Sequence, residues 1–273
     1  MIQPLGLLAF LVSAPTNGWT VAALHDAGRL EVRSDDCADS HRQCALVDVI
    51  HEAANRGARL LVLPEYALHL EEPAPPTTVG APPPPGHVLA PLAAAAGARD
   101  ITVIVALWRR DRDGHHRNSQ VVLGSDETVR AVHDKVELFS EERAWATPGD
   151  DLSVVEVDGI RVGLLICADL YAAPALHAEL VHAKKAQLVA VSAQWTATGA
   201  ERWPATFAHD WQVPVVFANA GTGDGLGSGA FLAGGAAVHV TRSRAPELFL
   251  VELPISPPSA PSVPRPTPAG SAH

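Results

Sequence analysis

The hydrophobic positions of this chain follow two alternating patterns. A spacing of three and four residues predicts a helix from about Asp39 to Arg56, in which Leu46, Val49 and Ile50 share one face. Continuous apolar runs such as "ITVIVALW" (101–108) are typical of strands buried on both faces. Further strands are predicted within 19–32 and at 58–66, 117–124, 128–135, 152–167 (a hairpin), 187–193, 213–219, 236–240 and 247–253, with helices near 88–98, 174–186 and 199–211. Helices that alternate with buried strands and hairpins predict an α/β layered domain with mixed sheets.

Three segments do not fit these patterns. Residues 1–18 are predicted to be an N-terminal arm or a signal-like segment, 19–253 the folded domain, and 254–273 a disordered tail rich in Pro, Ser and Ala. The proline-rich stretch 71–87 is predicted to be a long loop. No Lys or Arg occurs before Arg29, whereas a secretory signal normally starts with positive charge. A cytoplasmic location is therefore expected, and export through the apolar N-terminus is the alternative.

The charge of the chain argues against some classes of partner. The formal net charge is −10, and the basic residues are scattered, so neither nucleic acid nor insertion into a membrane is expected. The densest basic cluster, "RRDRDGHHR" (109–117), contains Asp113-Gly114 and is predicted to be a hairpin turn.

The three cysteines do not form a disulfide framework of the secreted kind. Cys37 and Cys44 are seven residues apart, which is two helical turns, so on one continuous helix they could not bridge. A reduced setting is the simplest expectation.

Three reactive residues each follow a strand-like segment. Glu65 ends "ARLLVLPEY", Lys135 ends "VRAVHDK" and Cys167 follows "GIRVGLLI". Two of them also have a purely structural explanation. A strand-end glutamate such as Glu65 often faces water, and a free cysteine such as Cys167 often only fills space in the core. Lys135 is the stronger indication of a functional site, because the chain has three lysines against seventeen arginines and so rarely uses lysine as its cation. A compact ammonium can stabilise a developing oxyanion, partial burial would raise the pKa of Glu65, and a helix start after Cys167 would favour a thiolate.

Other reactive patterns are weaker. No pair of the thirteen histidines has the spacing of a helical metal-ligand pair, so no metal is expected. A papain-like catalytic pair of Cys167 with His209 or His239 would give Lys135 no role. The sequence around Cys167 also lacks the papain signature. The alternating glycines at 221–229 fit no phosphate-binding motif and predict a flexible loop.

The stretches "LLVLPEYAL", "HDKVELFSEE" and "GIRVGLLICADLY" together resemble the nitrilase superfamily of carbon–nitrogen hydrolases, which has a Glu-Lys-Cys triad. Their order and separations fit as well, and the resemblance covers roughly 19–253. It implies a four-layer αββα sandwich with two mixed β-sheets, a homodimer, a small-molecule amide substrate and no cofactor. "C-A-D-L-Y" after the strand departs from the common "C-Y-D-[LI]-R" and is similar to the pantetheinase and biotinidase-like branch.

The resemblance also assigns roles to residues. Glu65, Lys135 and Cys167 are expected to be catalytic, and the backbone N–H of Ala168 is expected to help bind the oxyanion. A second glutamate follows the lysine in this family, and Glu142 is the better match, although Glu141 is adjacent. Beyond these residues, the pocket candidates are Tyr66, Tyr171 and Trp195.

The expected reaction is hydrolysis of a linear amide through a cysteine thioester. A nitrilase or an N-acyltransferase on the same fold is the enzyme alternative. An interaction protein that has lost turnover is the alternative of another class.

Overall fold

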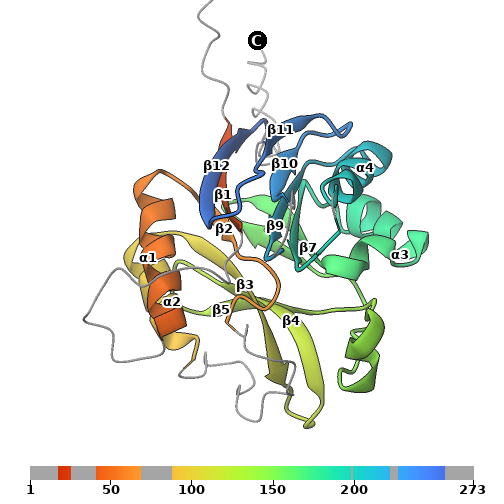
Figure 1. Ribbon diagram of the computed structural model, residues 1–273, viewed down its shortest axis with the longest axis horizontal. Helices are drawn as coiled ribbons and strands as arrows, with labels where there is room; N and C mark the ends of the chain where they lie inside the picture. Colours follow the sequence, from red (N-terminus) through yellow and green to blue (C-terminus); the bar gives the residue numbers. More distant parts are fainter. Residues whose placement is uncertain (1–17, 26–40, 69–87, 198, 222–226, 256–273) are drawn as a thin grey trace, which may run out of the picture.

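Two six-stranded β-sheets lie face to face in the computed structural model, which describes residues 18–25, 41–68, 88–197, 199–221 and 227–255 (Figure 1). The predicted N-terminal arm, the loop 71–87, Cys37 and most of the Pro-rich tail lie outside the described residues.

The first sheet has the strand order β12-β1-β2-β3-β4-β5. Its middle strands β1, β2 and β3 are parallel, and antiparallel strands flank them on both sides. The strands are β1 (Trp19–His25), β2 (Leu60–Val62), β3 (Thr102–Arg110), β4 (His116–Leu123), β5 (Val129–Asp134) and β12 (Glu247–Leu253).

The second sheet repeats this mixed pattern, with the order β11-β10-β9-β8-β7-β6 and β7, β8 and β9 parallel. Its strands are β6 (Val154–Val157), β7 (Ile160–Ile166), β8 (Leu188–Ala193), β9 (Val215–Asn219), β10 (Gly229–Phe231) and β11 (Ala237–Val240).

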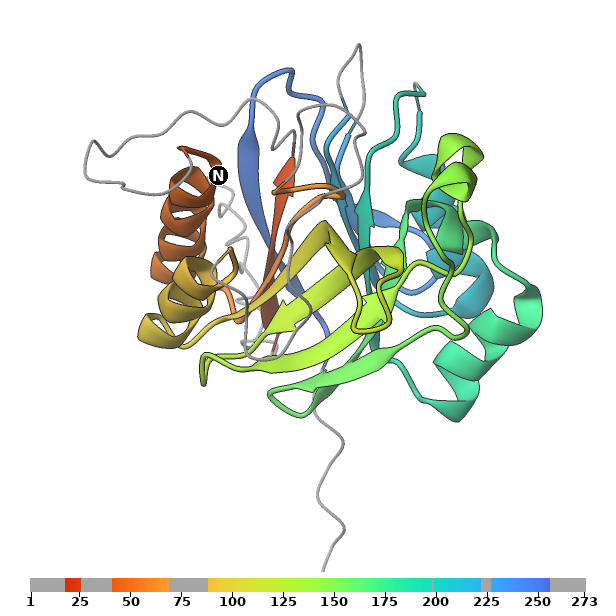
Figure 2. The ribbon, with the colours of Figure 1, turned by 90° about the horizontal axis from the view of Figure 1, so that it is seen from below.

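Helices cover the outer face of each sheet, so the molecule has four layers (Figures 1 and 2). The α-helices α1 (His41–Asn55) and α2 (Ala90–Ala98) pack on the first sheet, and α3 (Pro174–Ala178) and α4 (Arg202–Trp211) pack on the second. The chain also forms the 3₁₀ helices η2 (Ser140–Ala144) and η3 (Cys167–Tyr171) and the π-helix η4 (Glu179–Ala183). The predicted four-layer αββα sandwich with two mixed sheets is confirmed.

The strand pattern explains the central layer. Val62 and Ile104 of the first sheet pack against Leu164 and Ala190 of the second, and all four are fully buried. Because side chains alternate along a strand, neighbours such as Leu61 face the outer helices instead. Strands with both faces buried need continuous apolar runs, as the sequence shows.

The structure differs from the prediction in three places. The glycine-rich stretch ends in the short strand β10, and the residues from Cys167 to Tyr171 form the 3₁₀ helix η3, for which no element was predicted. The predicted helix 174–186 is a short α-helix followed by one π turn. These elements are too short for hydrophobic periodicity to reveal them.

The expectation that all cysteines are reduced is wrong, because Cys44 is disulfide-bonded. Cys44 lies in the first turn of α1, which begins at His41. The cysteines therefore no longer argue for a reducing compartment. No helix in the described part of the chain is long and apolar enough to cross a bilayer.

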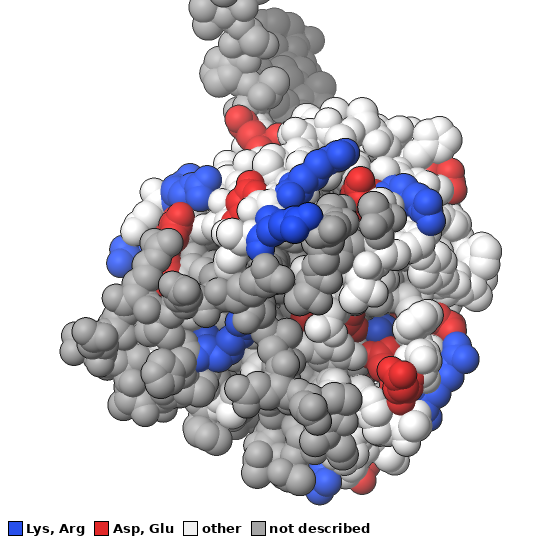
Figure 3. Space-filling view, viewed as in Figure 1, with Lys and Arg blue, Asp and Glu red and all other residues white. Residues whose placement is uncertain are grey.

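Charged side chains are interspersed on the face shown in Figure 3, where blue and red groups alternate over the described residues. The basic cluster at 109–117 is the predicted hairpin between β3 and β4, in which Arg110 pairs with His116.

Candidate active site

The ends of three strands bring Glu65, Lys135 and Cys167 together. Glu65 follows β2 after a Leu-Pro step, Lys135 follows β5 directly, and Cys167 follows β7 directly. All three side chains are buried, with exposures of 2%, 2% and 6%.

Lys135 sits between two carboxylates. Its Nζ donates to Oε1 of Glu65 at 2.8 Å and to Oε2 of Glu142 at 2.7 Å. The 3₁₀ helix η2 positions Glu142, whose Oε2 also accepts the backbone N–H of Phe139 at 2.8 Å. Glu141 is exposed on the same helix, so Glu142 is the glutamate that contacts the lysine.

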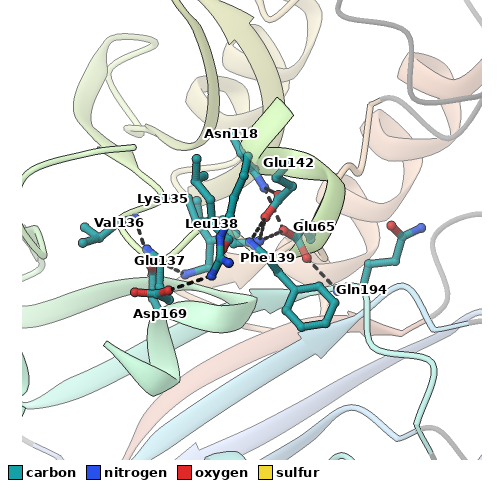
Figure 4. A network of polar contacts seen from close by, with 12 residues as sticks. Glu65, Asn118, Lys135, Val136, Glu137, Leu138, Phe139, Glu142, Asp169 and Gln194 are labelled. Carbon is teal, nitrogen blue, oxygen red and sulfur yellow. Dashed lines mark hydrogen bonds and ion pairs between the residues drawn. The ribbon is translucent and has the colours of Figure 1, made fainter. Parts of the chain in front are cut away.

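Sequence reasoning missed Asn118, which lies on β4 in the same cluster (Figure 4). Its Nδ2 lies 2.8 Å from Oε1 of Glu65 and 2.6 Å from Oε1 of Glu142. The available signal was a polar residue at the start of a buried apolar strand, "RNSQVVL". A buried amide must find partners, and here the partners are the site's carboxylates.

Glu65 also bridges to the second sheet. Its Oε2 accepts the backbone N–H of Gln194 at 2.9 Å, and its own N–H donates to the carbonyl of Ala193. The end of β8 therefore fixes the carboxylate of a residue that belongs to the first sheet.

Cys167 has a left-handed backbone, with φ of +48°, and Tyr66 has φ of +57°. Non-glycine residues adopt this region only when their surroundings impose it, and such strain clusters at functional sites. The turn directs the chain from β7 into η3, so that the buried Ala168 follows the thiol.

Asp169, which sequence reasoning also missed, joins the cysteine turn to the lysine segment. Its Oδ1 accepts the N–H groups of Val136 and Glu137 at 2.9 and 2.8 Å, and its Oδ2 accepts the N–H of Ile166 at 2.9 Å. His133 donates from Nε2 to the same oxygen at 2.8 Å. Figure 4 shows Asp169 beside the backbone that follows Lys135. One fully buried carboxylate thus holds the end of β5, in the first sheet, against the end of β7, in the second.

The electrostatics of the cluster favour a protonated thiol. Burial raises the pKa of the Cys167 thiol well above its usual value, the charge of Glu65 adds to this, and Lys135 opposes it. Burial therefore outweighs the influences that favour a thiolate.

The same burial acts on the other two groups. It raises the pKa of Glu65, against the opposing charge of Lys135. Burial acts to lower the pKa of Lys135, but the anionic groups around it, first among them Glu65, outweigh burial and raise that pKa. Lys135 is therefore a permanent cation, and Glu65 is the group suited to exchange a proton with Cys167.

The pocket candidates divide into two groups. The hydroxyl of Tyr66 donates to Oε1 of Glu142 at 2.5 Å, so it belongs to the buried cluster. Tyr171, on the 3₁₀ helix that begins at Cys167, is 52% exposed, and burial together with the charge of Cys167 raises its pKa to about 12. Trp195 is partly buried and its ring centroid lies 5.0 Å from that of Trp203, which in turn contacts Tyr171 at 5.9 Å.

The described residues offer one group with the arrangement of a metal site, Asp111, Asp113 and His115. It lies in the exposed β3–β4 turn, and Asp111 already accepts two backbone N–H groups and the guanidinium of Arg117. These carboxylate contacts account for the cluster without a cation. His209 pairs with the adjacent Asp210 on an exposed part of α4, and His239 stacks on Phe249.

Replacing Asp169 with asparagine should lower the free energy of unfolding by about 3–5 kcal/mol, because the amide nitrogen would then face two of the four donors. Urea unfolding at neutral pH measures the change. Asp126→Asn is the matched control, since Asp126 makes similar contacts with Thr128 and Arg130 on an exposed turn, and it should cost under about 1 kcal/mol. Equal losses of unfolding free energy in the two variants would contradict the role of Asp169 in holding the ends of β5 and β7 together.

Proteins of known sequence share part of this chain. A hydrolase of Mycobacterium tuberculosis is 36% identical over 152 residues, which are 53% of this chain and 52% of that protein. The chain thus spans about half the length of this relative. An (R)-stereoselective amidase of Pseudomonas is 34% identical over 85 residues, 31% of this chain and 30% of that protein.

Solved structures share the fold. An amidase from Nesterenkonia has a TM-score of 0.74 and 20% identity, covering 88% of this chain and 92% of that one. A variant of that amidase, with a TM-score of 0.73 and 21% identity over the same shares, shows covalent addition of the acetamide moiety of fluoroacetamide at its active-site cysteine.

The family model of the carbon–nitrogen hydrolases matches residues 42–222, which is more than half of the 273-residue chain. The matched range contains Glu65, Lys135, Glu142 and Cys167. The chain belongs to the carbon–nitrogen hydrolase family.

Proposed function

We propose that this protein hydrolyses a linear amide of a small molecule through a thioester on Cys167. The observation that carries the proposal is the buried cluster of one cation and two carboxylates, whose charges act directly on the thiol. A protein without turnover gains little from such a cluster, because buried ion pairs rarely add net stability.

The first half of the reaction forms the thioester. Glu65 accepts the proton of the Cys167 thiol as the sulfur attacks the amide carbonyl carbon. The carbonyl oxygen becomes an oxyanion, which the ammonium of Lys135 and the N–H of Ala168 stabilise. Glu65 then returns the proton to the amide nitrogen, the C–N bond breaks, and ammonia or an amine leaves.

The second half restores the enzyme. Glu65 takes a proton from water while the water oxygen attacks the thioester carbonyl. The C–S bond breaks, the carboxylic acid leaves, and the sulfur regains a proton from Glu65. Glu142 remains bonded to Lys135 throughout and keeps the ammonium oriented.

The relatives support amides over other substrates of this chemistry. The Pseudomonas and Nesterenkonia proteins are amidases, and the latter forms a covalent adduct at a cysteine. The exposed ring of Tyr171, on the same 3₁₀ helix as Cys167, suits the uncharged part of such a substrate.

The test is a panel of linear amides, carbamoyl compounds and nitriles incubated with the purified protein. Release of amine or ammonia gives the rate, and intact mass after an acid quench detects the thioester. Turnover of amides with a quenchable adduct is expected. Turnover of nitriles alone, or acyl transfer to an added amine without hydrolysis, would replace the proposal with one of those reactions, and no turnover or adduct with any class would contradict it.

A further inference from the structure

The side chain of Asn118 contacts one oxygen of each of the three acidic side chains around Lys135, which are Glu65, Glu142 and Tyr66. Its Nδ2 lies 2.8 Å from Glu65, 2.6 Å from Glu142 and 3.1 Å from the hydroxyl of Tyr66. Asn118 is 1% exposed, so water cannot supply these bonds in its place.

The buried cluster holds more negative than positive charge, and Asn118 stabilises the excess negative charge. Two buried carboxylates share a single ammonium, and their like charges disfavour ionising both. The remaining titratable groups that face them, the Tyr66 hydroxyl and the Cys167 thiol, bring no positive charge. A neutral amide donor stabilises both carboxylates without adding a second cation that would compete with Lys135.

The orientation of the Asn118 amide indicates that its NH₂ group serves the carboxylates. Three oxygen atoms face its nitrogen, so the NH₂ group must point into the cluster. Its own Oδ1 is then buried with no hydrogen-bond partner among the described residues. A buried oxygen without a partner lowers stability, so packing alone does not explain an asparagine here.

The backbone of Asn118 acts separately from its side chain. Its carbonyl accepts the N–H of Lys135 at 2.8 Å, and this bond survives any substitution at position 118. A side-chain variant therefore changes the contacts with the carboxylates while the strand still holds the lysine.

We propose that Asn118 is a positioning residue that donates one N–H to each carboxylate and so holds Glu65 ionised, in reach of Cys167, beside Glu142. The inference rests on the proposed function, in which Glu65 is the base. Asn118 acts through Glu65, so replacing Asn118 alters the protonation of the base as well as the rate of the reaction.

The sign of the effect follows from the contacts. The hydrogen bond from Asn118 lowers the pKa of Glu65, opposing burial. Removing the donor raises that pKa, and the base must be ionised to accept the thiol proton. The acid limb of kcat/KM therefore moves to higher pH.

The experiment compares Asn118→Ala and the isosteric Asn118→Asp with Gln120→Ala. Gln120 lies two residues along β4, is fully buried and donates to Ser192 at 2.9 Å, so its variant loses a buried polar contact of similar depth. Two pH profiles are recorded for each protein: kcat/KM on the best amide of the panel, and the rate of Cys167 alkylation by iodoacetamide, mapped by mass.

Both Asn118 variants should show the acid limb raised by about one pH unit or more and lose about 10- to 100-fold in kcat/KM near neutral pH. Gln120→Ala should keep the wild-type midpoint even if its melting temperature falls. If Asn118→Ala does not fold, Asn118→Asp, which keeps the shape, decides the question.

An unchanged midpoint in the Asn118 variants, or a uniform loss at every pH, would overturn the inference while leaving the amidase proposal intact. If the wild-type protein turns over no amide, the proposed function fails. The alkylation profile then still decides whether Asn118 controls the protonation of the cluster.

Discussion

Replacing Cys167 with alanine is expected to abolish amide turnover and the covalent adduct while the protein stays folded. The sulfur is the only atom that can form the thioester, and loss of a nucleophile of this kind costs on the order of 10⁴-fold or more in rate. Alanine retains the Cβ, so the positive φ of +48° is no more strained than before. Stability should change by only about 1 kcal/mol.

Cys167→Ser is the matched comparison, because it keeps a hydrogen-bonding group at the same place. A hydroxyl is a far weaker nucleophile than a thiol, so this variant should also be inactive toward amides. Rates are measured with the best substrate of the panel, and circular dichroism checks the fold. Residual turnover in the alanine variant above a hundredth of the wild-type rate would exclude Cys167 as the nucleophile.

The sequence predicted the layers well for a physical reason. Strands buried on both faces require continuous apolar runs, and these runs are visible without any knowledge of the fold. Two of these runs lead to Glu65 and Cys167, and parallel strands such as β2 and β7 place their carboxyl ends at sheet edges where loops can meet.

The remaining contacts could not be predicted from local pattern. Asn118 precedes Lys135 by seventeen residues on the neighbouring strand, and its contacts depend on the exact pairing of β4 with β5. Asp169 depends on a turn whose backbone has a left-handed residue, which no hydrophobic period encodes. The disulfide of Cys44 has no signal in the local hydrophobic pattern either.

The protonation of the thiol depends on the balance of two effects. A helix start and a nearby ammonium favour a thiolate, whereas burial and two carboxylates oppose it. The sequence identifies these residues but does not show how deeply each side chain is buried. With the thiol protonated at rest, a base becomes necessary, which gives Glu65 a role that a preformed thiolate would not require.

Replacing Lys135 with methionine should have the largest effect on stability of any change in this cluster. It leaves Glu65 and Glu142 buried without their cation, and breaking a buried pair in this way costs about 3–5 kcal/mol. Turnover should fall below detection, because the oxyanion loses its charged donor. Urea unfolding and the amide assay measure the two effects.

The stability loss of this variant should depend on pH in a definite direction. The charge of Lys135 lowers the pKa of Glu65 against burial, so its removal raises that pKa further above the value in the unfolded chain. The folded variant then binds more protons than the unfolded chain, and its stability rises as the pH falls through the raised pKa. The deficit relative to wild type should therefore be greatest above neutral pH and smaller near pH 5.

Lys135→Arg separates charge from geometry. A guanidinium keeps the cation, so most of the stability should remain, but its planar donors cannot occupy the place of the compact ammonium between two carboxylates. We expect a loss of about 10²- to 10³-fold in kcat with a pH-independent stability deficit. If the arginine variant turned over amides at the wild-type rate, Lys135 would be a structural counter-ion and the oxyanion would have to be stabilised by backbone N–H groups alone.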